Sequence, residues 1–318
     1  MHYMGSKARH ASEIIAITCA GRKSGQAYVE PFVGGGNVIC RVPAEYGPRI
    51  ANDINKYMVA LLDAVGNRGW LPPETMSKDE HTLIKANPDS YPPELVGFAA
   101  TGPTFGSVWM GPWAPDPDGK PGMRYRQARD AVKKDAPGLK GVVFHCGSFD
   151  QFGIPPESII YCDPPYAGDA LNSSERGYGS KVKIEVGETL SKNNWSTKKF
   201  WGWADSLADA GHRVFVSEYN GPSPRLYGAT QELKTKLTDV LAKFRDVQAN
   251  PASLRSEYDA ATASVKAVEA EVKKCAERQA ARWCVLWEKE VSSDFHSERE
   301  KGVKEAKREV ERLFHRIP

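Results

Sequence analysis

"IIYCDPPYAG", from Ile159 to Gly168, ends an apolar run with an acid, two prolines and a tyrosine. The run up to Cys162 has the composition of a short buried strand that ends at Asp163. Pro164 and Pro165 have no backbone N–H and cannot continue a sheet ladder, so the chain must leave the sheet there. We therefore expect a stiff loop at the carboxyl end of a strand, where open α/β sheets bind ligands. A plain Pro-Pro turn with an Asp cap is the alternative that this stretch alone leaves open.

Four other segments contain a short apolar strand followed by a turn. They are "AYVEPFVGGGNVI" (27–39), "RIANDINKYMVALLDAV" (49–65), "GVVFHCGSFDQF" (141–152) and "HRVFVSEYN" (212–220). In the second segment an acidic turn at Asp53 leads into an amphipathic helix. Strands that alternate with helices predict a parallel, doubly wound α/β sheet.

Residues 76–140 break this alternation and predict an irregular insertion that ends in a basic helix from about Tyr125. The insertion is rich in Gly, Pro and Trp, with "FGSVWMGPW" (105–113) at its centre. Between Lys120 and Lys140 the chain has seven Lys or Arg residues against two Asp. Such a run is either a solvated helix face or a surface for phosphate groups.

Residues 229–281 form a second interruption, with apolar residues at heptad spacing on both sides of "ANPAS". This pattern predicts two helices in an antiparallel coiled-coil hairpin. A hairpin returns the chain to its start, so the sheet can resume in 282–318 at "CVLWEKEV". The second helix has few large apolar residues for the seam. Two roles of the hairpin stay possible at this point: it forms a homodimer, or it projects into solvent as an arm.

Composition limits the classes of protein that remain. The chain has 318 residues, 41% of them hydrophobic, and a net charge of +3, too weak by itself to indicate a nucleic-acid partner. Its six cysteines form no C-x-x-C pair, and no His/Cys cluster has metal-ligand spacing. No signal pattern and no long apolar run occur. We expect a cytoplasmic protein without a metal centre.

The turn at Gly34, Gly35 and Gly36 predicts a nucleoside-containing cofactor, because glycine lets the backbone approach a ligand closely. It lacks G-x-G-x-x-G spacing and the chain has no P-loop, which disfavours a nicotinamide dehydrogenase. Asp53 lies about 20 residues further on, a spacing that suits a carboxylate on ribose hydroxyls. A helix N-cap is the alternative for Asp53. S-adenosylmethionine fits, since it has a ribose and an adenine but no phosphates.

Four motifs occur in the following order along the chain: "YMGSK" (3–7), "VEPFVGGGNVI" (29–39), "ANDIN" (51–55) and "YCDPPY" (161–166). In this order the chain resembles the Dam-type, D12 class DNA N6-adenine methyltransferases over nearly its whole length except the hairpin. Looser motifs such as "VFVSEYNGP" (214–222) resemble the phage and prophage branch. The resemblance implies a Rossmann-like methyltransferase sheet built from 1–75, 141–228 and 282–318. Residues 76–140 would then be a target-recognition insertion.

The resemblance also implies site residues. The cofactor-binding set is Tyr3, Lys7, Pro31, Phe32, Gly34, Gly35, Gly36, Asp53, Ser148, Phe149 and Asp163. Ser148 stands where the family commonly has Asp, and Asp150 follows, so either could read the cofactor's adenine. The catalytic set is Asp163, Pro164, Pro165 and Tyr166. The DNA-binding set is Arg124, Arg126, Arg129, Lys133 and Lys134.

The opening loop suits methylation of an exocyclic amino group. The lone pair of such an amine is delocalised into the ring, and two acceptors on its N–H bonds favour the reactive geometry. Asp163 and Pro164 would supply them, and Tyr166 would stack on a base flipped out of double-stranded DNA. No metal is needed, since positioning and electrostatics suffice. The alternatives are an N4-cytosine enzyme, an RNA guanine enzyme, or a non-enzymatic DNA-binding or scaffold protein.

Overall fold

The computed structural model describes residues 1–116, 122–165, 196–218, 283–291 and 309–316, with isolated positions between 239 and 270. The predictions for Tyr166 and for the hairpin over 229–281 fall outside these residues, apart from those isolated positions.

The described residues form one seven-stranded sheet in the order β3-β2-β1-β4-β5-β7-β6. Its strands are β1 (Tyr28–Glu30), β2 (Arg49–Asp53), β3 (Val142–Cys146), β4 (Ile159–Cys162), β5 (Arg213–Glu218), β6 (Trp283–Val291) and β7 (Glu309–Arg316). The first five strands in this order are parallel, and β7 runs antiparallel to both neighbours. The predicted mixed α/β sheet with a parallel core is confirmed.

The strand order reverses between β1 and β4. From β1 the chain moves outward through β2 to β3, and then returns to place β4 on the other side of β1. At such a switch point the loops after the two central strands diverge and leave a crevice at the carboxyl edge of the sheet. The stretch that includes Asp163 leaves the sheet at this point, as its sequence predicted.

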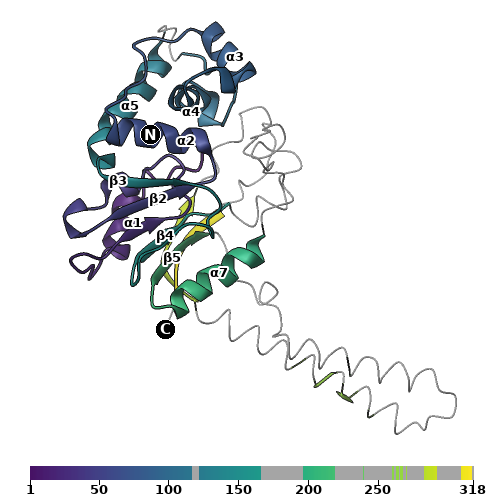
Figure 1. Cartoon of the computed structure of the whole chain (residues 1–318). Helices are drawn as coiled ribbons and strands as arrows, with labels where there is room; N and C mark the ends of the chain where they lie inside the picture. The colour runs from purple at the N-terminus through teal and green to yellow at the C-terminus, as the bar shows by residue number, and fades with distance from the viewer. Residues whose placement is uncertain are drawn as a thin grey trace, which may run out of the picture.

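Helices cover both faces of the sheet, because side chains alternate along each strand. Tyr28, Tyr161 and Phe215 point into a core shared with α1 (Ala11–Thr18), α2 (Lys56–Asn67) and α5 (Met123–Leu139). Val29 and Ile160 point the other way, into a core shared with α7 (Thr197–Asp209). Figure 1 shows α2 and α7 on opposite sides of the strands.

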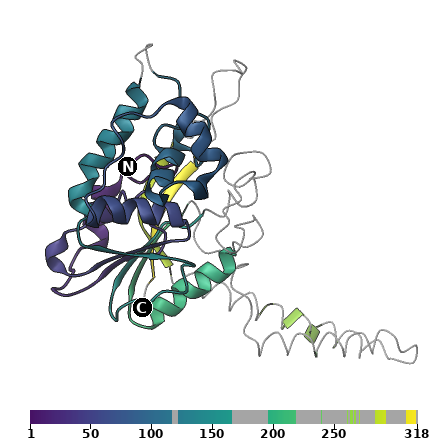
Figure 2. The ribbon, with the colours of Figure 1, turned by 45° about the horizontal axis from the view of Figure 1, so that its top comes forward.

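Residues 76–140 are more helical than their composition predicted. They contain α3 (Lys78–Ala86) and α4 (Pro93–Thr101) before α5, so the expectation of an irregular first half is wrong. The cause is local: Ser77 and Glu80 form a capping box that starts α3, and prolines start α4. The predicted basic helix from about Tyr125 is confirmed as α5. In Figure 2 these helices lie together above the sheet.

Short 3₁₀ turns complete the described elements: η1 (Ile39–Arg41), η2 (Ala44–Tyr46), η3 (Pro88–Ser90) and η4 (Phe105–Ser107). Within the described ranges, no helix has both the length and the apolar composition needed to cross a membrane.

Candidate active site

The glycine turn after β1 lies directly against Tyr3 of the amino-terminal segment. A Cβ added to Gly34 would lie 2.8 Å from Tyr3 Cε1, and one added to Gly35 would lie 2.7 Å from Tyr3 Cβ. Gly34 also has a φ of 48°, in the left-handed region. Only glycine fits this contact, so the turn and the "YMGSK" segment form one surface at the carboxyl end of β1.

Asp53 closes the same turn from the end of β2. The backbone N–H of Gly34 donates to Asp53 Oδ2 (2.8 Å), and the N–H of Asn55 donates to Oδ1 (2.9 Å). Burial raises the pKa of Asp53 above its ordinary value, and these backbone donors oppose the rise. The helix N-cap that Asp53 was alternatively predicted to be is Asn55, whose side chain accepts from the first turn of α2.

Asn52 fastens together the loops that follow β1 and β3. Its Nδ2 donates to the carbonyl oxygens of Pro31 (3.1 Å) and Gly147 (3.0 Å). The side chain is buried, and its Oδ1 has no hydrogen-bond partner among the described residues. The carbonyl of Asp53 accepts from the N–H of Gly147 (3.0 Å). The three loops at this edge are therefore held by one another.

The loop after β3 contains Ser148, Phe149 and Asp150. The Ser148 hydroxyl donates to Asp150 Oδ1, and Lys199 of α7 lies 2.6 Å from Asp150 Oδ2. Burial raises the pKa of Asp150, but the hydrogen bonds from Lys199 and Ser148 outweigh it, and the net shift is downward. The two candidates for reading an adenine are thus joined to each other.

Aromatic rings gather next to this loop. The ring of Phe149 lies 5.3 Å from that of Phe32, in the loop after β1, and 5.0 Å from that of Trp203 on α7. Lys199 Nζ lies 5.6 Å from the centre of the Phe149 ring. Phe32 and Phe149 are both only half-buried. They present an aromatic surface at the same edge of the sheet as Asp53.

Lys7 and Asp163 form an ion pair that joins the amino-terminal segment to the loop after β4. Lys7 Nζ lies 2.9 Å from Asp163 Oδ1, and the two side chains are 9% and 22% exposed. Lys7 also donates to the carbonyl of Gly5 (3.2 Å). Pro164 is buried and Pro165 is exposed. Sequence reasoning assigned Lys7 and Asp163 to one site but did not predict that they touch.

Glu30, at the end of β1, is a buried acid that sequence reasoning missed. The residue is 3% exposed, and its Oε1 has no hydrogen-bond partner among the described residues. Burial, followed by the nearby charge of Asp163, raises the pKa of Glu30 well above its ordinary value. The signal that could have found it is an acid inside an apolar strand, directly before Pro31.

The predicted DNA-binding residues lie on α5 and not in these loops. Arg124, Arg126, Lys133 and Lys134 are exposed. Arg129 is only 11% exposed: its Nε donates to the carbonyl of Pro72 (2.9 Å), and its guanidinium pairs with Glu74. The guanidinium of Arg129 therefore holds the segment before α3 onto α5. Across the described ranges, no group of three or more His, Cys, Asp or Glu side chains converges as metal ligands do.

Residues 3–91 match the model of a family described as D12 class N6 adenine-specific DNA methyltransferase. No curated protein sequence matches the chain.

Among the solved structures that match is the magnesium protoporphyrin IX methyltransferase (ChlM) of Synechocystis PCC 6803, with bound SAH. It is 11% identical, the match covers 98% of this chain and 83% of that one, and the TM-score is 0.33, a similarity too weak to indicate function. The family match spans Tyr3, Lys7, the glycine turn and Asp53. Over residues 3–91 the chain thus matches the D12 class N6 adenine-specific DNA methyltransferases, the family that its four motifs resemble.

Proposed function

We propose that the protein transfers a methyl group from S-adenosylmethionine to the N6 amino group of adenine in double-stranded DNA. The observation that carries the proposal is the contact between Lys7 and Asp163 (2.9 Å). Lys7 lies inside the segment that matches the methyltransferase family, whereas Asp163 lies 72 residues beyond its end, since 163 − 91 = 72. The ion pair therefore supports reading the D-P-P-Y loop as part of the same site.

The residues at the switch point suit the cofactor. Asp53 is a carboxylate at the end of β2, the position that accepts ribose hydroxyls in nucleoside-binding sheets. Glu30 and Asn52 each have a buried oxygen without a described hydrogen-bond partner, and polar ligand groups satisfy such atoms. Phe32 and Phe149 offer a half-buried aromatic surface for a purine. S-adenosylmethionine supplies an already activated methyl group when it is bound.

Asp163 and Pro164 would prepare the adenine amino group. A carboxylate oxygen and a carbonyl oxygen that accept its two N–H bonds favour the geometry in which the nitrogen lone pair is available. Both acceptors follow directly from the rigid end of β4. Lys7 stabilises the negative charge of Asp163 through a charge-assisted contact. An ammonium has three donors, so this contact is compatible with a second one to the carboxylate of the cofactor.

Adenine cannot reach such a loop from inside a duplex, so the base must be flipped out. The helices of residues 76–140 would hold the DNA while this happens. The exposed cations Arg124, Arg126, Lys133 and Lys134 would face the DNA, with Arg126, Lys133 and Lys134 on its phosphates. Arg129 is left out of this set because the guanidinium is already engaged by Glu74 and the Pro72 carbonyl.

A labelled methyl donor tests the reaction and its alternatives together. Purified protein is incubated with labelled S-adenosylmethionine and with DNA or RNA, and the modified nucleosides are identified. N6-methyladenine in DNA is expected. N4-methylcytosine or methylguanine in RNA as the sole product would contradict the proposal. No transfer at all, with intact DNA binding, would favour a scaffold protein.

The Asp163→Ala variant tests the site within the same assay. Turnover should be lost while the variant stays folded, because the substitution removes an acceptor that acts in the transition state. Near-normal turnover by a folded variant would contradict the assigned role of Asp163.

Three broader expectations accompany this function. The segments 1–75, 141–228 and 282–318 would form the catalytic unit, with 76–140 as the target-recognition insertion. Because the substrate is DNA, the enzyme is expected to work in the cytoplasm of a bacterial or phage-infected cell. A homodimer through 229–281 stays a prediction, and light scattering of a protein with a Gly-Ser linker in place of the hairpin would test it.

A further inference from the structure

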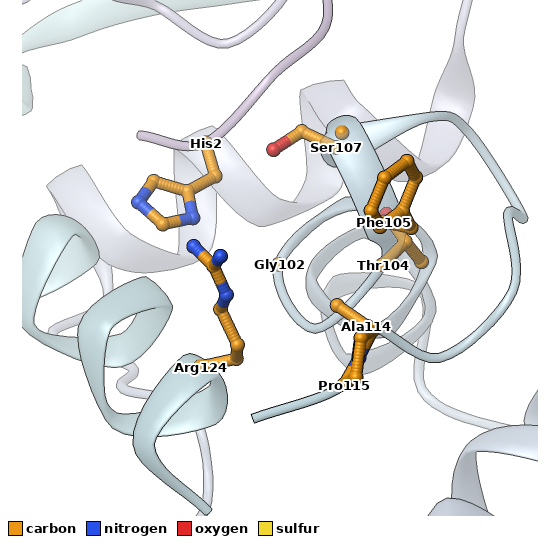
Figure 3. A pocket seen from close by; sticks show the side chains of 9 residues that line it. His2, Gly102, Thr104, Phe105, Ser107, Ala114, Pro115 and Arg124 are labelled. Carbon is orange, nitrogen blue, oxygen red and sulfur yellow. The ribbon is translucent and has the colours of Figure 1, made fainter. Parts of the chain in front are cut away.

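A cavity of about 340 Å³ lies in the helical unit, outside the loops of the active site. Figure 3 shows His2 and Arg124 directed toward one another on one side, with Phe105 and Ser107 on the other side. Gly102, Ala114 and Pro115 form most of the remaining wall. A largely apolar wall with a few directed polar groups is typical of sites for small planar ligands.

The loop that carries Phe105 is firmly held. The N–H of Phe105 donates to the Pro112 carbonyl (2.9 Å), and the N–H of Met110 donates to the Ala100 carbonyl (2.8 Å). Lys85 donates to the Gly111 carbonyl (3.0 Å). Despite these contacts, Phe105 is 56% exposed, the highest value among the large apolar residues described. An aromatic ring exposed on a fixed loop is suited to stacking on a base.

The polar side of the cavity has one cation and one neutral ring. Burial lowers the pKa of His2, the positive charges of the N-terminal ammonium and Arg124 lower it further, and a hydrogen bond with the Gly102 backbone and the charge of Asp135 oppose this. The planar fork of Arg124 matches a base edge that offers two acceptors.

His2, which lines the cavity, is close in sequence to two residues of the active site. His2 is followed by Tyr3, which lies against the glycine turn, and by Lys7, which pairs with Asp163. One short segment therefore contributes to both places. A base held in the cavity would be a near neighbour of the adenine that is methylated.

We propose that this cavity reads one guanine of the DNA substrate, with the base packed on Phe105 and its edge bonded to Arg124. Guanine presents O6 and N7 together along one edge, the pair of acceptors that an arginine fork recognises. Neighbouring bases cover its faces in a duplex, so the guanine must be unstacked to pack on Phe105. The inference rests on the proposed function and adds to it a base-reading site. Arg126 lies on the same helix, is exposed and does not line the cavity, so it provides a matched control.

Sequence preference is the first measurement. A DNA library of random sequence is methylated, and the modified adenines are mapped by long-read sequencing. The wild-type protein should prefer guanine at one position, and Arg124→Ala should lose about 5- to 150-fold of that preference. Arg126→Ala should lower methylation evenly across sequences. Phe105→Ala should weaken methylation, whereas Leu83→Ala, at a residue 55% exposed on α3, should not.

Binding gives a second measurement that does not depend on methylation, and its main comparison uses the wild-type protein alone. The wild-type protein is titrated with duplexes in which single guanines are replaced by 7-deazaguanine, which lacks the N7 acceptor. One replacement should weaken binding, and Arg124→Ala should bind both duplexes equally. Equal binding of all duplexes by the wild-type protein would overturn the inference. A guanine preference in binding without any N6-methyladenine would overturn the proposed function and leave the base-reading site standing.

Discussion

The ion pair between Lys7 and Asp163 is the central contact of the site, and its coupling free energy can be measured by unfolding. At a separation of 2.9 Å, two unit charges attract by about 6 kcal/mol in an effective dielectric of about 20. The free-energy cost of removing water from both charges offsets much of this attraction, because the side chains are only 9% and 22% exposed. We expect a coupling free energy of about 2 kcal/mol, within the range for residues in contact. Lys7→Met alone should cost about 3 kcal/mol, since it removes the Lys7 cation from the partly buried Asp163 carboxylate.

Urea unfolding of four proteins measures this coupling: the wild type, Lys7→Met, Asp163→Asn and the double variant. The exposed pair Lys56–Asp89 is the matched control, since it has a similar separation of 3.0 Å but exposures of 38% and 70%. Its coupling should be close to zero, because water and salt screen an exposed pair. An equally small coupling between Lys7 and Asp163 would refute the reasoning and separate the amino-terminal segment from the catalytic loop.

Three further predictions concern the glycine turn, the cofactor and pH. Gly35→Ala should weaken cofactor binding, measured by calorimetry, and stability, measured by urea unfolding, by about 1–3 kcal/mol, because the added Cβ would lie 2.7 Å from Tyr3 Cβ. Gly153→Ala is the control: an added Cβ there has no atom within 4 Å, so neither quantity should change. Asp53→Ala should weaken cofactor binding by about 1.5–3 kcal/mol, and titration calorimetry that shows no loss would contradict its ribose role. Burial and the nearby charge of Lys85 lower the pKa of His81 to about 4 in the folded protein, whereas a histidine in the unfolded chain has a pKa near 6.5. Between pH 6.5 and pH 4 the unfolded chain therefore binds more protons than the folded protein, so the free energy of unfolding falls as the pH drops. From pH 7 to pH 5 the wild type should therefore lose about 2 kcal/mol more than His81→Phe in urea unfolding, and parallel pH profiles would contradict this.

The parts of the fold that sequence predicts are those fixed by nearby residues. The end of β4 follows from an apolar run that meets two prolines, which cannot extend a ladder. The helix α5 follows from its periodic basic pattern. The capping box of Ser77 and Glu80 was equally local and would have predicted α3, but the Gly and Pro content of the surrounding segment obscured it.

The contacts that assemble the site join residues far apart in sequence. Lys7 and Asp163 are separated by 156 residues, and no periodicity connects them. Asn52 sits in a turn-like "NDIN" stretch, yet its amide bridges the carbonyls of Pro31 and Gly147. The motifs identify the residues of the site. Which of these residues contact one another depends on the order of the strands in the folded sheet, and the motifs do not give that order.

The pairing of β5 with β7 has a consequence for how the protein is made. Glu218 ends β5 and Glu309 begins β7, so the 90 residues 219–308 lie between the two pairing strands. At about 5 to 20 residues per second, a ribosome needs about 5 to 18 s to synthesise this interval. During that time β5 is the outermost parallel strand, and its edge, which includes Val214 and Val216, has no neighbour from the finished sheet. An apolar edge left open for seconds is a surface for chaperones or for misassociation between nascent chains. Synonymous codons that slow translation across 219–308 should therefore reduce the yield of native enzyme without changing a single amino acid.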